Sequence, residues 1–250
     1  MIIDVHAHLG LDRTFDELFT EAELWEKVEK YNVDITILQP GTVHTVAEVI
    51  DQHDVIADLC RRHPGKFVGM ANPNPHLRAA EYEKELTRCV EELGFVGVKI
   101  HPAAHGVNPS GKDGLHVFEV ARGLNIPVMV HTGTGIPFAC PAVAIPIAEQ
   151  FPDVPIVLAH SGMMVLANET AIVLKHCPNV HTDLTWTMGV QIKQWVADFG
   201  AHRFMFGTDQ PINCGPELTK IRESGLTEDA QEWILAKTAQ KVFNLSTANG

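Results

Sequence analysis

Histidine and aspartate side chains recur at the ends of short apolar runs in this 250-residue sequence. His6 and His8 stand at the C-terminal end of the first predicted strand, and because they are two residues apart, they point to the same face. Three more polar residues end later runs: His131, His160 and Asp209. Two imidazoles on one strand, a third opposite and a carboxylate suit a divalent cation. Zinc is the first expectation, with manganese, iron or nickel as alternatives.

A single histidine at a strand end has a simpler interpretation, because its ring can cap the strand by bonding to nearby backbone. Recurrence at corresponding ends favours the metal site, provided that the fold brings these ends together. The remaining histidines stand in predicted helices or loops and are interpreted as surface or packing residues. Examples are His44, His53, His63, His76 and His176.

Eight apolar runs, rich in Val, Ile and Phe, have the length of buried parallel strands. They cover residues 1–6, 34–39, 67–71, 95–101, 127–131, 155–160, 180–184 and 203–209. Amphipathic stretches between them predict helices, clearest over 46–60, 79–93 and 113–124, and a last helical region over 227–245 begins at Thr227 as N-cap.

Alternation of strands and helices predicts an α/β fold with a helix-covered parallel sheet. Eight repeats favour a closed (β/α)8 TIM barrel over an open doubly wound sheet, which would show a GxGxxG motif after the first strand. In such a barrel the carboxyl ends of all strands meet at one mouth, where the active site lies. No linker divides the chain, so residues 1–250 are expected to form one domain, with a frayed tail over 246–250.

The composition argues against several partners and compartments. The formal net charge is −12, and no Lys/Arg cluster offers the counterion release that drives nucleic-acid binding. The five cysteines form no CxxC pair, so neither a disulfide framework nor a thiolate zinc site is predicted. No signal-peptide pattern and no apolar run of about 18 residues is present. A cytoplasmic protein without a membrane segment is the expectation.

Five segments carry a specific resemblance. They are Ile3–His8 (IDVHAH), Gly97–Pro102 (GVKIHP), Val130–Gly133 (VHTG), Leu158–Gly162 (LAHSG) and Phe206–Pro211 (FGTDQP). In order and over nearly the whole chain, they resemble the motifs of the amidohydrolase superfamily. The branch they resemble most holds TIM-barrel metal-dependent hydrolases together with nonoxidative decarboxylases.

The resemblance implies that His6, His8, His131 and Asp209 hold or approach the metal. It implies less about His160, whose equivalent is a ligand in two-metal members. In single-metal members it acts beside the ion as an acid, a base or an electrostatic clamp.

Lys99 governs the choice between one ion and two. It precedes His101 by two residues, so both side chains are expected to face the barrel interior. The resemblance implies that a carboxylated Lys99 would bridge two metals, as in ureases and dihydroorotases, yet members of this branch with a similar Lys-x-His-Pro run are often mononuclear. One ion is favoured. Lys99 would then be an ammonium that pairs with a substrate carboxylate, with Asp209 or with Asp4, or else forms a structural ion pair in the core.

The predicted reaction is hydrolysis of an amide, lactone or ester of a small carboxylic acid. A bound divalent metal lowers the pKa of its water from about 15.7 to about 7. Asp209 would orient that water and pass its proton to the leaving group, while His160 would help to stabilise the oxyanion. Lys99 and His101 are expected to bind an acidic or carbonyl part of the substrate. Trp186 would form an apolar wall, unless it is simply a core tryptophan.

Three alternatives stay open. A nonoxidative decarboxylase of a small unsaturated or aromatic acid would use the same ligands, with an acid protonating the carbanion-like carbon. A phosphoesterase of the polymerase-and-histidinol-phosphatase type also begins with His-x-His on a β/α barrel, but it needs further His and Glu ligands. A catalytically inactive binding barrel is disfavoured by the intact ligand set.

Specificity is expected in the loops over residues 9–20, 102–113, 134–142 and 186–190. They carry few charged side chains, so a small and partly apolar ligand is predicted. A homodimer is compatible with the sequence, because dimers are the commonest assemblies of soluble proteins.

Overall fold

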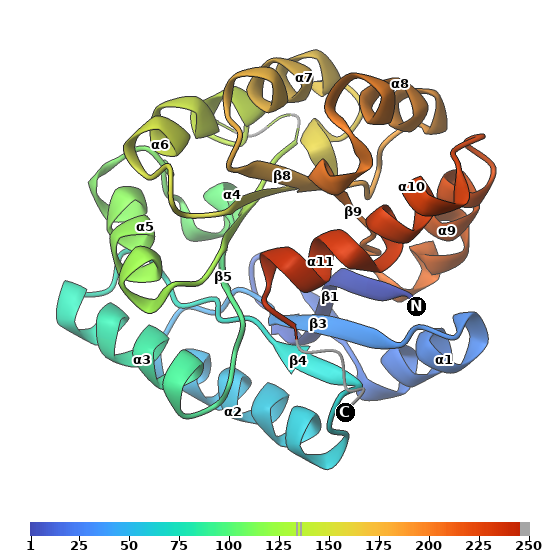
Figure 1. Ribbon diagram of the computed structural model, residues 1–250. Coiled ribbons are helices and arrows are strands. Elements are labelled where there is room, and N and C mark those ends of the chain that lie inside the picture. Colours follow the sequence, from blue (N-terminus) through green and yellow to red (C-terminus); the bar gives the residue numbers. More distant parts are fainter. Residues whose placement is uncertain (134, 136, 246–250) are drawn as a thin grey trace.

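Eight parallel strands form the wall of a barrel in the computed structural model, which describes residues 1–133, 135 and 137–245 (Figure 1). The strands β1, β3 and β4 make one arc, and β5 to β9 make the other. Isolated parallel bridges from Ala7 to Asp209 and from Ala71 to Val98 join the two arcs. The strands are β1 (Ile3–Asp12), β3 (Ile35–Pro40), β4 (Phe67–Gly69), β5 (Val98–Ile100), β6 (Val128–His131), β7 (Ile156–Ala159), β8 (Val180–Asp183) and β9 (Phe204–Met205). Each coincides with a predicted run, so the predicted TIM barrel is confirmed.

Helices surround the strands, as Figure 1 shows. They are α1 (Glu21–Tyr31), α2 (Val46–Arg62), α3 (Ala79–Glu91), α4 (Pro102–His105), α5 (Lys112–Leu124), α6 (Ala144–Gln150), α7 (Ala167–His176), α8 (Gly189–Phe199), α9 (Cys214–Arg222), α10 (Glu228–Glu232) and α11 (Thr238–Val242). Short 3-10 turns are η1 (Pro141–Val143), η2 (His160–Gly162), η3 (Ala201–Arg203) and η4 (Pro211–Asn213), and η5 (Trp233–Lys237) is π-helical. The predicted N-cap is confirmed, since the Thr227 hydroxyl accepts a hydrogen bond from the backbone N–H of Ala230.

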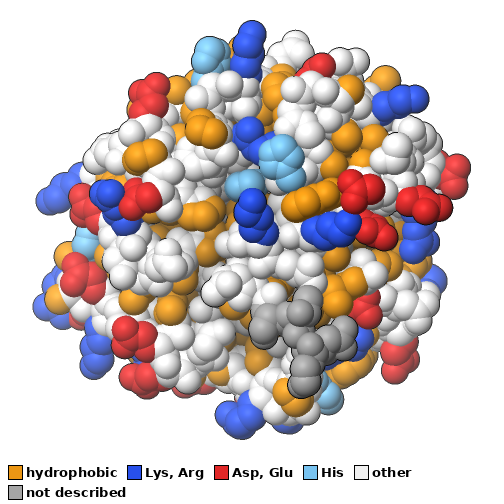
Figure 2. All heavy atoms as spheres, viewed as in Figure 1, with side chains coloured by type: hydrophobic (Ala, Val, Ile, Leu, Met, Phe, Trp, Pro, Cys, Tyr) orange, Lys and Arg blue, Asp and Glu red, His pale blue; other side chains and the backbone are white. Residues whose placement is uncertain are grey.

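Apolar side chains fill two spaces, one between strands and helices and one inside the barrel. The interior cluster comprises Ile3, Val5, Ile37, Met70, Met129, Val157, Ala159, Met205, Ala236, Ala239, Val242 and Phe243. Its last four members come from η5, α11 and the residue after α11, which therefore close the amino end of the barrel. Figure 1 looks onto this closed end, and Figure 2 shows Lys, Arg and His side chains near the middle of the same face. The carboxyl ends of the strands open on the opposite side.

A register shift in β1 directs the first histidine pair inward. Between Asp4 and Ala7 the strand advances three residues, while β3 advances only two, from Thr36 to Leu38. Such an extra residue re-aims the side chains that follow it. Val5 therefore packs in the interior apolar cluster although its neighbour His6 also faces the site. Simple alternation along the strand could not have predicted this.

The segment after the first histidine pair differs from the loop that the sequence predicted over residues 9–20. Strand β1 continues to Asp12, and β2 (Glu17–Phe19) returns antiparallel beside it, with Gly10 opposite Phe19. The ring of Phe19 lies 5.2 Å from that of His8, measured between centroids. This arm therefore forms one wall of the barrel mouth.

Candidate metal centre

Three ligand atoms converge where β1 and the segment after β9 meet. The Nε2 atoms of His6 and His8 each lie 3.4 Å from Oδ1 of Asp209, and the three ligand atoms lie within 4.8 Å of one another. Two ligands about 2.1 Å from one ion, at the tetrahedral angle, are separated by about 3.4 Å. The donor types and their spacing therefore fit a divalent cation.

The other two predicted histidines lie beside this group without joining it as closely. His160 packs its ring 4.7 Å from that of His6, and the ring of His131 lies 4.7 Å from that of His160. His131 also stacks on His101 with 3.9 Å between centroids. The imidazoles thus form a continuous cluster across the mouth, although the tight three-atom group contains only His6, His8 and Asp209.

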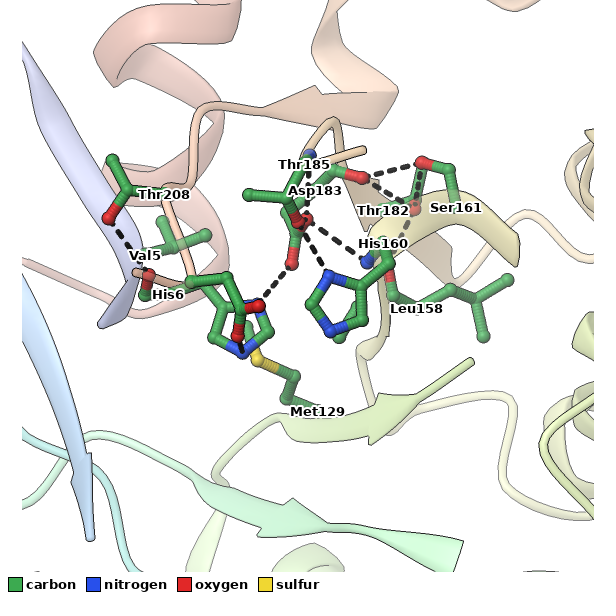
Figure 3. Close-up of polar contacts among 12 residues, drawn as sticks. Val5, His6, Met129, Leu158, His160, Ser161, Thr182, Asp183, Thr185 and Thr208 are labelled. Carbon is green, nitrogen blue, oxygen red and sulfur yellow. Dashed lines mark hydrogen bonds and ion pairs between the residues drawn. The ribbon is translucent and has the colours of Figure 1, made fainter. Parts of the chain in front are cut away.

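Asp183, the last residue of β8, was not singled out in the sequence, although it stands next to the end of the apolar run over 180–184. Its Oδ2 lies 2.9 Å from Nδ1 of His6, and its Oδ1 accepts the backbone N–H groups of His160 and Thr185 (Figure 3). Applying the strand-end rule to this run would have found it. Thr185, by contrast, carries no such signal.

Lys99 lies at the floor of the mouth and is 2% exposed. Its Nζ is 2.9 Å from Nε2 of His6 and 3.6 Å from Sδ of Met129. Among the described residues no carboxylate oxygen lies within 4.0 Å of this Nζ. The alternative that Lys99 pairs with Asp4 is wrong, because Lys27 from α1 occupies that carboxylate at 2.6 Å. Pairing with Asp209 is likewise not observed.

Asp209 is fixed from several sides. Its backbone N–H donates to the carbonyl of His6, and its Oδ2 accepts a 3.2 Å hydrogen bond from the indole Nε1 of Trp186. The preceding residue, Thr208, donates its N–H and its hydroxyl to the two oxygens of Asp4. Trp186 was predicted as an apolar wall; the structure places its polar edge on the carboxylate.

His101 begins α4 as its N-cap and is 9% exposed. Its Nδ1 accepts the backbone N–H of Ala104 at 3.2 Å. A neutral imidazole with an acceptor at Nδ1 carries its proton on Nε2. The ring of Phe15 lies 5.4 Å away. His101 therefore has an N–H left to offer a ligand beside an aromatic wall.

Protonation states in the mouth suit cation binding. Burial lowers the pKa of His160 to about 3 and that of His101 to about 2, with the charge of Lys99 adding to the effect on His101. Burial, followed by Lys99, also holds the pKa of His6 well below its usual value. Burial lowers the pKa of Lys99 to about 8. For Asp209, burial favours a raised pKa, but the surrounding imidazoles, His160 first, hold it well below normal. Neutral imidazoles and an ionised carboxylate are the forms that bind metals.

Three residues at the mouth adopt left-handed backbone conformations, which non-glycine residues rarely do. The φ angles are 69° for His160, 60° for Trp186 and 62° for Asp209. Strain of this kind concentrates at functional sites and persists where surrounding contacts enforce it. Here the contacts to Asp183, Glu217 and the carbonyl of His6 supply that enforcement.

A second group of ligand-type side chains lies away from the mouth, between α2 and α3. Nδ1 of His53 is 2.7 Å from Oε1 of Glu85, and Sγ of Cys89 is 3.2 Å from the same nitrogen. Arg88 donates to both oxygens of Glu85 at 2.8 and 2.9 Å. The backbone N–H of Asn72 donates to Nε2 of His53 at 3.0 Å, so the ring carries its proton on Nδ1. These contacts make a closed hydrogen-bonded network with no nitrogen lone pair of His53 left for an ion.

Comparison with known proteins agrees with the fold. The amidohydrolase family profile matches residues 3–245. The chain belongs to the amidohydrolase family. The family resemblance drawn from the five motifs is thereby confirmed, and with it a place among metal-dependent hydrolases and decarboxylases. No protein of curated function matches the sequence.

Several solved structures of this family are similar over nearly the full length of both chains. A 2,6-dihydroxybenzoate decarboxylase from Rhizobium is 16% identical, with a TM-score of 0.76 and coverage of 97% of this chain and 98% of that one. A 5-carboxyvanillate decarboxylase from Novosphingobium aromaticivorans, complexed with manganese and 4-hydroxy-3-methoxy-5-nitrobenzoic acid, is 16% identical, with a TM-score of 0.78 and coverage of 98% and 96%. A protein from Acinetobacter baumannii, whose name assigns it to 2-pyrone-4,6-dicarboxylic acid hydrolysis, is 14% identical, with a TM-score of 0.71 and coverage of 98% and 99%.

These findings bear on the cofactor and the partners. The donor set is that of a divalent-metal site, and some of the similar structures, the 5-carboxyvanillate decarboxylase among them, contain manganese rather than the zinc expected first. Small aromatic acids are the ligands bound in related structures. Within the described part of the chain, no helix is both long enough and apolar enough to cross a membrane.

Proposed function

We propose that this protein is a divalent-metal-dependent nonoxidative decarboxylase of a small aromatic acid. The observation that carries the proposal is Lys99, a buried cation beside the ligand group with no carboxylate partner among the described residues. A buried ammonium is costly unless an anion pairs with it. A substrate carboxylate supplies that anion.

The walls of the mouth suit a flat ligand. Phe15 lies against His101, Phe19 lies against His8, and the indole of Trp186 contacts Asp209. Aromatic rings stack favourably on one another with centroids about 4.5 to 7 Å apart. The aromatic acids bound in similar structures agree with this choice of substrate, and they favour decarboxylation over the hydrolysis expected from the sequence.

The chain's own residues can perform the steps of decarboxylation. When bound at His6, His8 and Asp209, with His131 and His160 adjacent, a divalent cation supplies positive charge that orients an acidic substrate. Lys99 binds the carboxylate, and the Nε2–H of His101 donates to a second substrate oxygen. Asp209 takes a proton from a substrate hydroxyl and delivers it to the ring carbon that bears the carboxylate. The carbon–carbon bond then breaks, its electron pair stays on the protonated ring, and carbon dioxide leaves.

Hydrolysis of a lactone or related ester of a small acid is the second candidate, because one similar structure is named as a probable 2-pyrone-4,6-dicarboxylic acid hydrolase, and a 2-pyrone is a cyclic ester. The same residues would serve it, with Lys99 and His101 on the acid and Asp209 on the attacking water. The two reactions differ in the fate of one proton, since decarboxylation transfers a proton derived from solvent to carbon, where it no longer exchanges.

The test uses that proton. The manganese-loaded and the zinc-loaded protein are incubated in D2O with dihydroxybenzoates and carboxyvanillate, each labelled with ¹³C in the carboxyl group, and with 2-pyrone-4,6-dicarboxylate. The proposal predicts ¹³C-labelled carbon dioxide and deuterium on the carbon that lost the carboxyl group. Ring opening of the pyrone without release of labelled carbon dioxide from any benzoate would establish the hydrolase instead.

A further inference from the structure

Two residues at the end of β8, Asp183 and Thr185, form one hydrogen-bonded unit with both His6 and His160. We propose that this unit fixes the tautomers of the two histidines, so that each presents the bare Nε2 lone pair to the mouth. Asp183 and Thr185 are thus positioning residues. The inference deepens the proposed function, but it holds for any metal-dependent reaction at this site.

The contacts that carry the inference are all buried. Asp183 and Thr185 are fully buried, and His6 and His160 nearly so. Oδ2 of Asp183 is 2.9 Å from Nδ1 of His6. The hydroxyl of Thr185 contacts Oδ1 of Asp183 on one side and lies 2.9 Å from Nδ1 of His160 on the other. Figure 3 shows the two imidazoles next to each other, with Asp183 and Thr185 above them.

Proton counting assigns the direction of each bond. Oδ1 of Asp183 already accepts two backbone N–H groups, from His160 and Thr185, which identifies the carboxylate as an acceptor. The single hydroxyl proton of Thr185 therefore goes to Asp183, and the hydroxyl oxygen must accept from Nδ1–H of His160. By the same reasoning, Nδ1–H of His6 donates to the other oxygen of Asp183. Each neutral ring is then left with a lone pair on Nε2.

The lone pairs have chemical consequences. At His6, Nε2 is the atom that lies 3.4 Å from Asp209 and 2.9 Å from Lys99, so it is the atom available to a cation. A carboxylate on the second nitrogen of a ligating histidine raises its basicity and fixes its orientation. At His160 the same arrangement makes the ring an acceptor or ligand at rest, and excludes a resting role as proton donor.

The direct test reads the proton positions in the full-length chain. Protein labelled with [¹⁵N]histidine is studied by long-range ¹⁵N–¹H correlation, metal-free and zinc-loaded, with the signals of His6 and His160 assigned from His6→Gln and His160→Gln. The inference predicts Nδ1–H for both rings in the metal-free protein. A proton on Nε2 of either ring would overturn it, whether or not the variants at Asp183 and Thr185 fold.

Variants at the two positioning residues test the cause. Asp183→Asn turns the acceptor that faces His6 into an N–H donor, so the proton of His6 should move to Nε2 and zinc affinity should fall by about 10- to 100-fold. Thr185→Val removes the acceptor of His160 and should scramble the tautomer of that ring alone. Thr185→Ser keeps the hydroxyl and should restore both the spectrum and the affinity.

The outcomes separate this inference from the proposed function. A Thr185→Val protein with an unchanged His160 tautomer, or an Asp183→Asn protein with unchanged zinc affinity, would refute the role assigned to that residue. Failure of the decarboxylase assay would leave both measurements intact, because neither requires turnover. If Thr185→Val does not fold, the wild-type spectrum and the Asp183→Asn titration still decide.

Discussion

The described part of the chain brings histidine and carboxylate side chains together in two places, at the mouth and between α2 and α3, and only the mouth is built to receive an ion. Between α2 and α3, His53 donates to Glu85, Glu85 accepts from Nε and Nη2 of Arg88, and both ring nitrogens of His53 are occupied. At the mouth, Nε2 of His6 and of His8 face one carboxylate oxygen at 3.4 Å, and the nearby cation Lys99 has no carboxylate within 4.0 Å in the described chain.

The comparison teaches that residue types and proximity do not by themselves define a metal site. The Arg88 guanidinium neutralises the negative charge of Glu85, which would otherwise attract a cation. Asp183, on the far nitrogen of His6, instead adds negative charge behind the imidazole and makes it a stronger ligand. Ring nitrogens directed at one carboxylate oxygen, with Asp183 on the far nitrogen of His6, distinguish the mouth from the helix-side network.

The largest expected effect comes from a substitution that disrupts the ligand group at the mouth and leaves the helix-side network intact. His6→Ala should abolish stoichiometric metal binding and lower turnover by about 100-fold or more, because the ion loses its best-oriented ligand. His53→Ala is the matched control, since it removes a histidine that is equally buried. Elemental analysis and steady-state rates on the two variants decide. Metal loss in His53→Ala with retention in His6→Ala would reverse the comparison.

A smaller effect separates Lys99 at the mouth from Arg88 in the helix-side network. Lys99→Met should raise KM for an acidic substrate by about 10-fold or more, with a lesser effect on kcat, because the substrate carboxylate loses its partner. Arg88→Met removes a cation already neutralised by Glu85 and Asp54, and it should leave KM unchanged while reducing stability. Equal KM values for wild type and Lys99→Met would remove the basis of the acid-substrate assignment.

Metal removal gives the next effect in size, and it also counts the ions. At a free metal concentration about 100 times Kd, binding stabilises the folded chain by about 2.7 kcal/mol, so chelation should lower the melting temperature measurably. The shift should vanish in His6→Ala and persist in His53→Ala. One manganese or zinc per chain is expected. Two per chain, retained only in the presence of bicarbonate, would indicate a carboxylated Lys99.

The sequence was sufficient to predict the barrel and the positions of the polar strand ends, because eight runs and their terminal residues follow from local pattern alone. Asp183 obeys the same rule and could have been found. Other features depend on contacts between distant segments. These are the ion pair of Lys27 with Asp4, the register shift in β1 that turns His6 inward, and the place of Thr185 between Asp183 and His160. No local pattern encodes such contacts.

The smallest predicted effect concerns acid stability and belongs to the helix-side network. Hydrogen bonds from His53 and Arg88 outweigh the opposing effect of burial and lower the pKa of Glu85 from 4.5 to about 2. A carboxyl group whose pKa is lower in the folded chain stabilises it above about pH 4.5, and this contribution is lost as the pH falls from there towards 2. Between pH 6 and pH 3 the loss amounts to about 2 kcal/mol.

Glu85→Gln removes the titrating group and leaves the metal ligands untouched. Urea unfolding of the metal-free protein between pH 6 and 3 should therefore show a shallower decline in unfolding free energy for Glu85→Gln than for wild type. Metal-free protein is required, because protonation of the mouth histidines also weakens cation binding and would add a second pH dependence. Identical slopes would mean that Glu85 is not selectively stabilised as an anion. The helix-side group would then lack the feature that distinguishes it from the mouth, a Glu85 anion neutralised by Arg88.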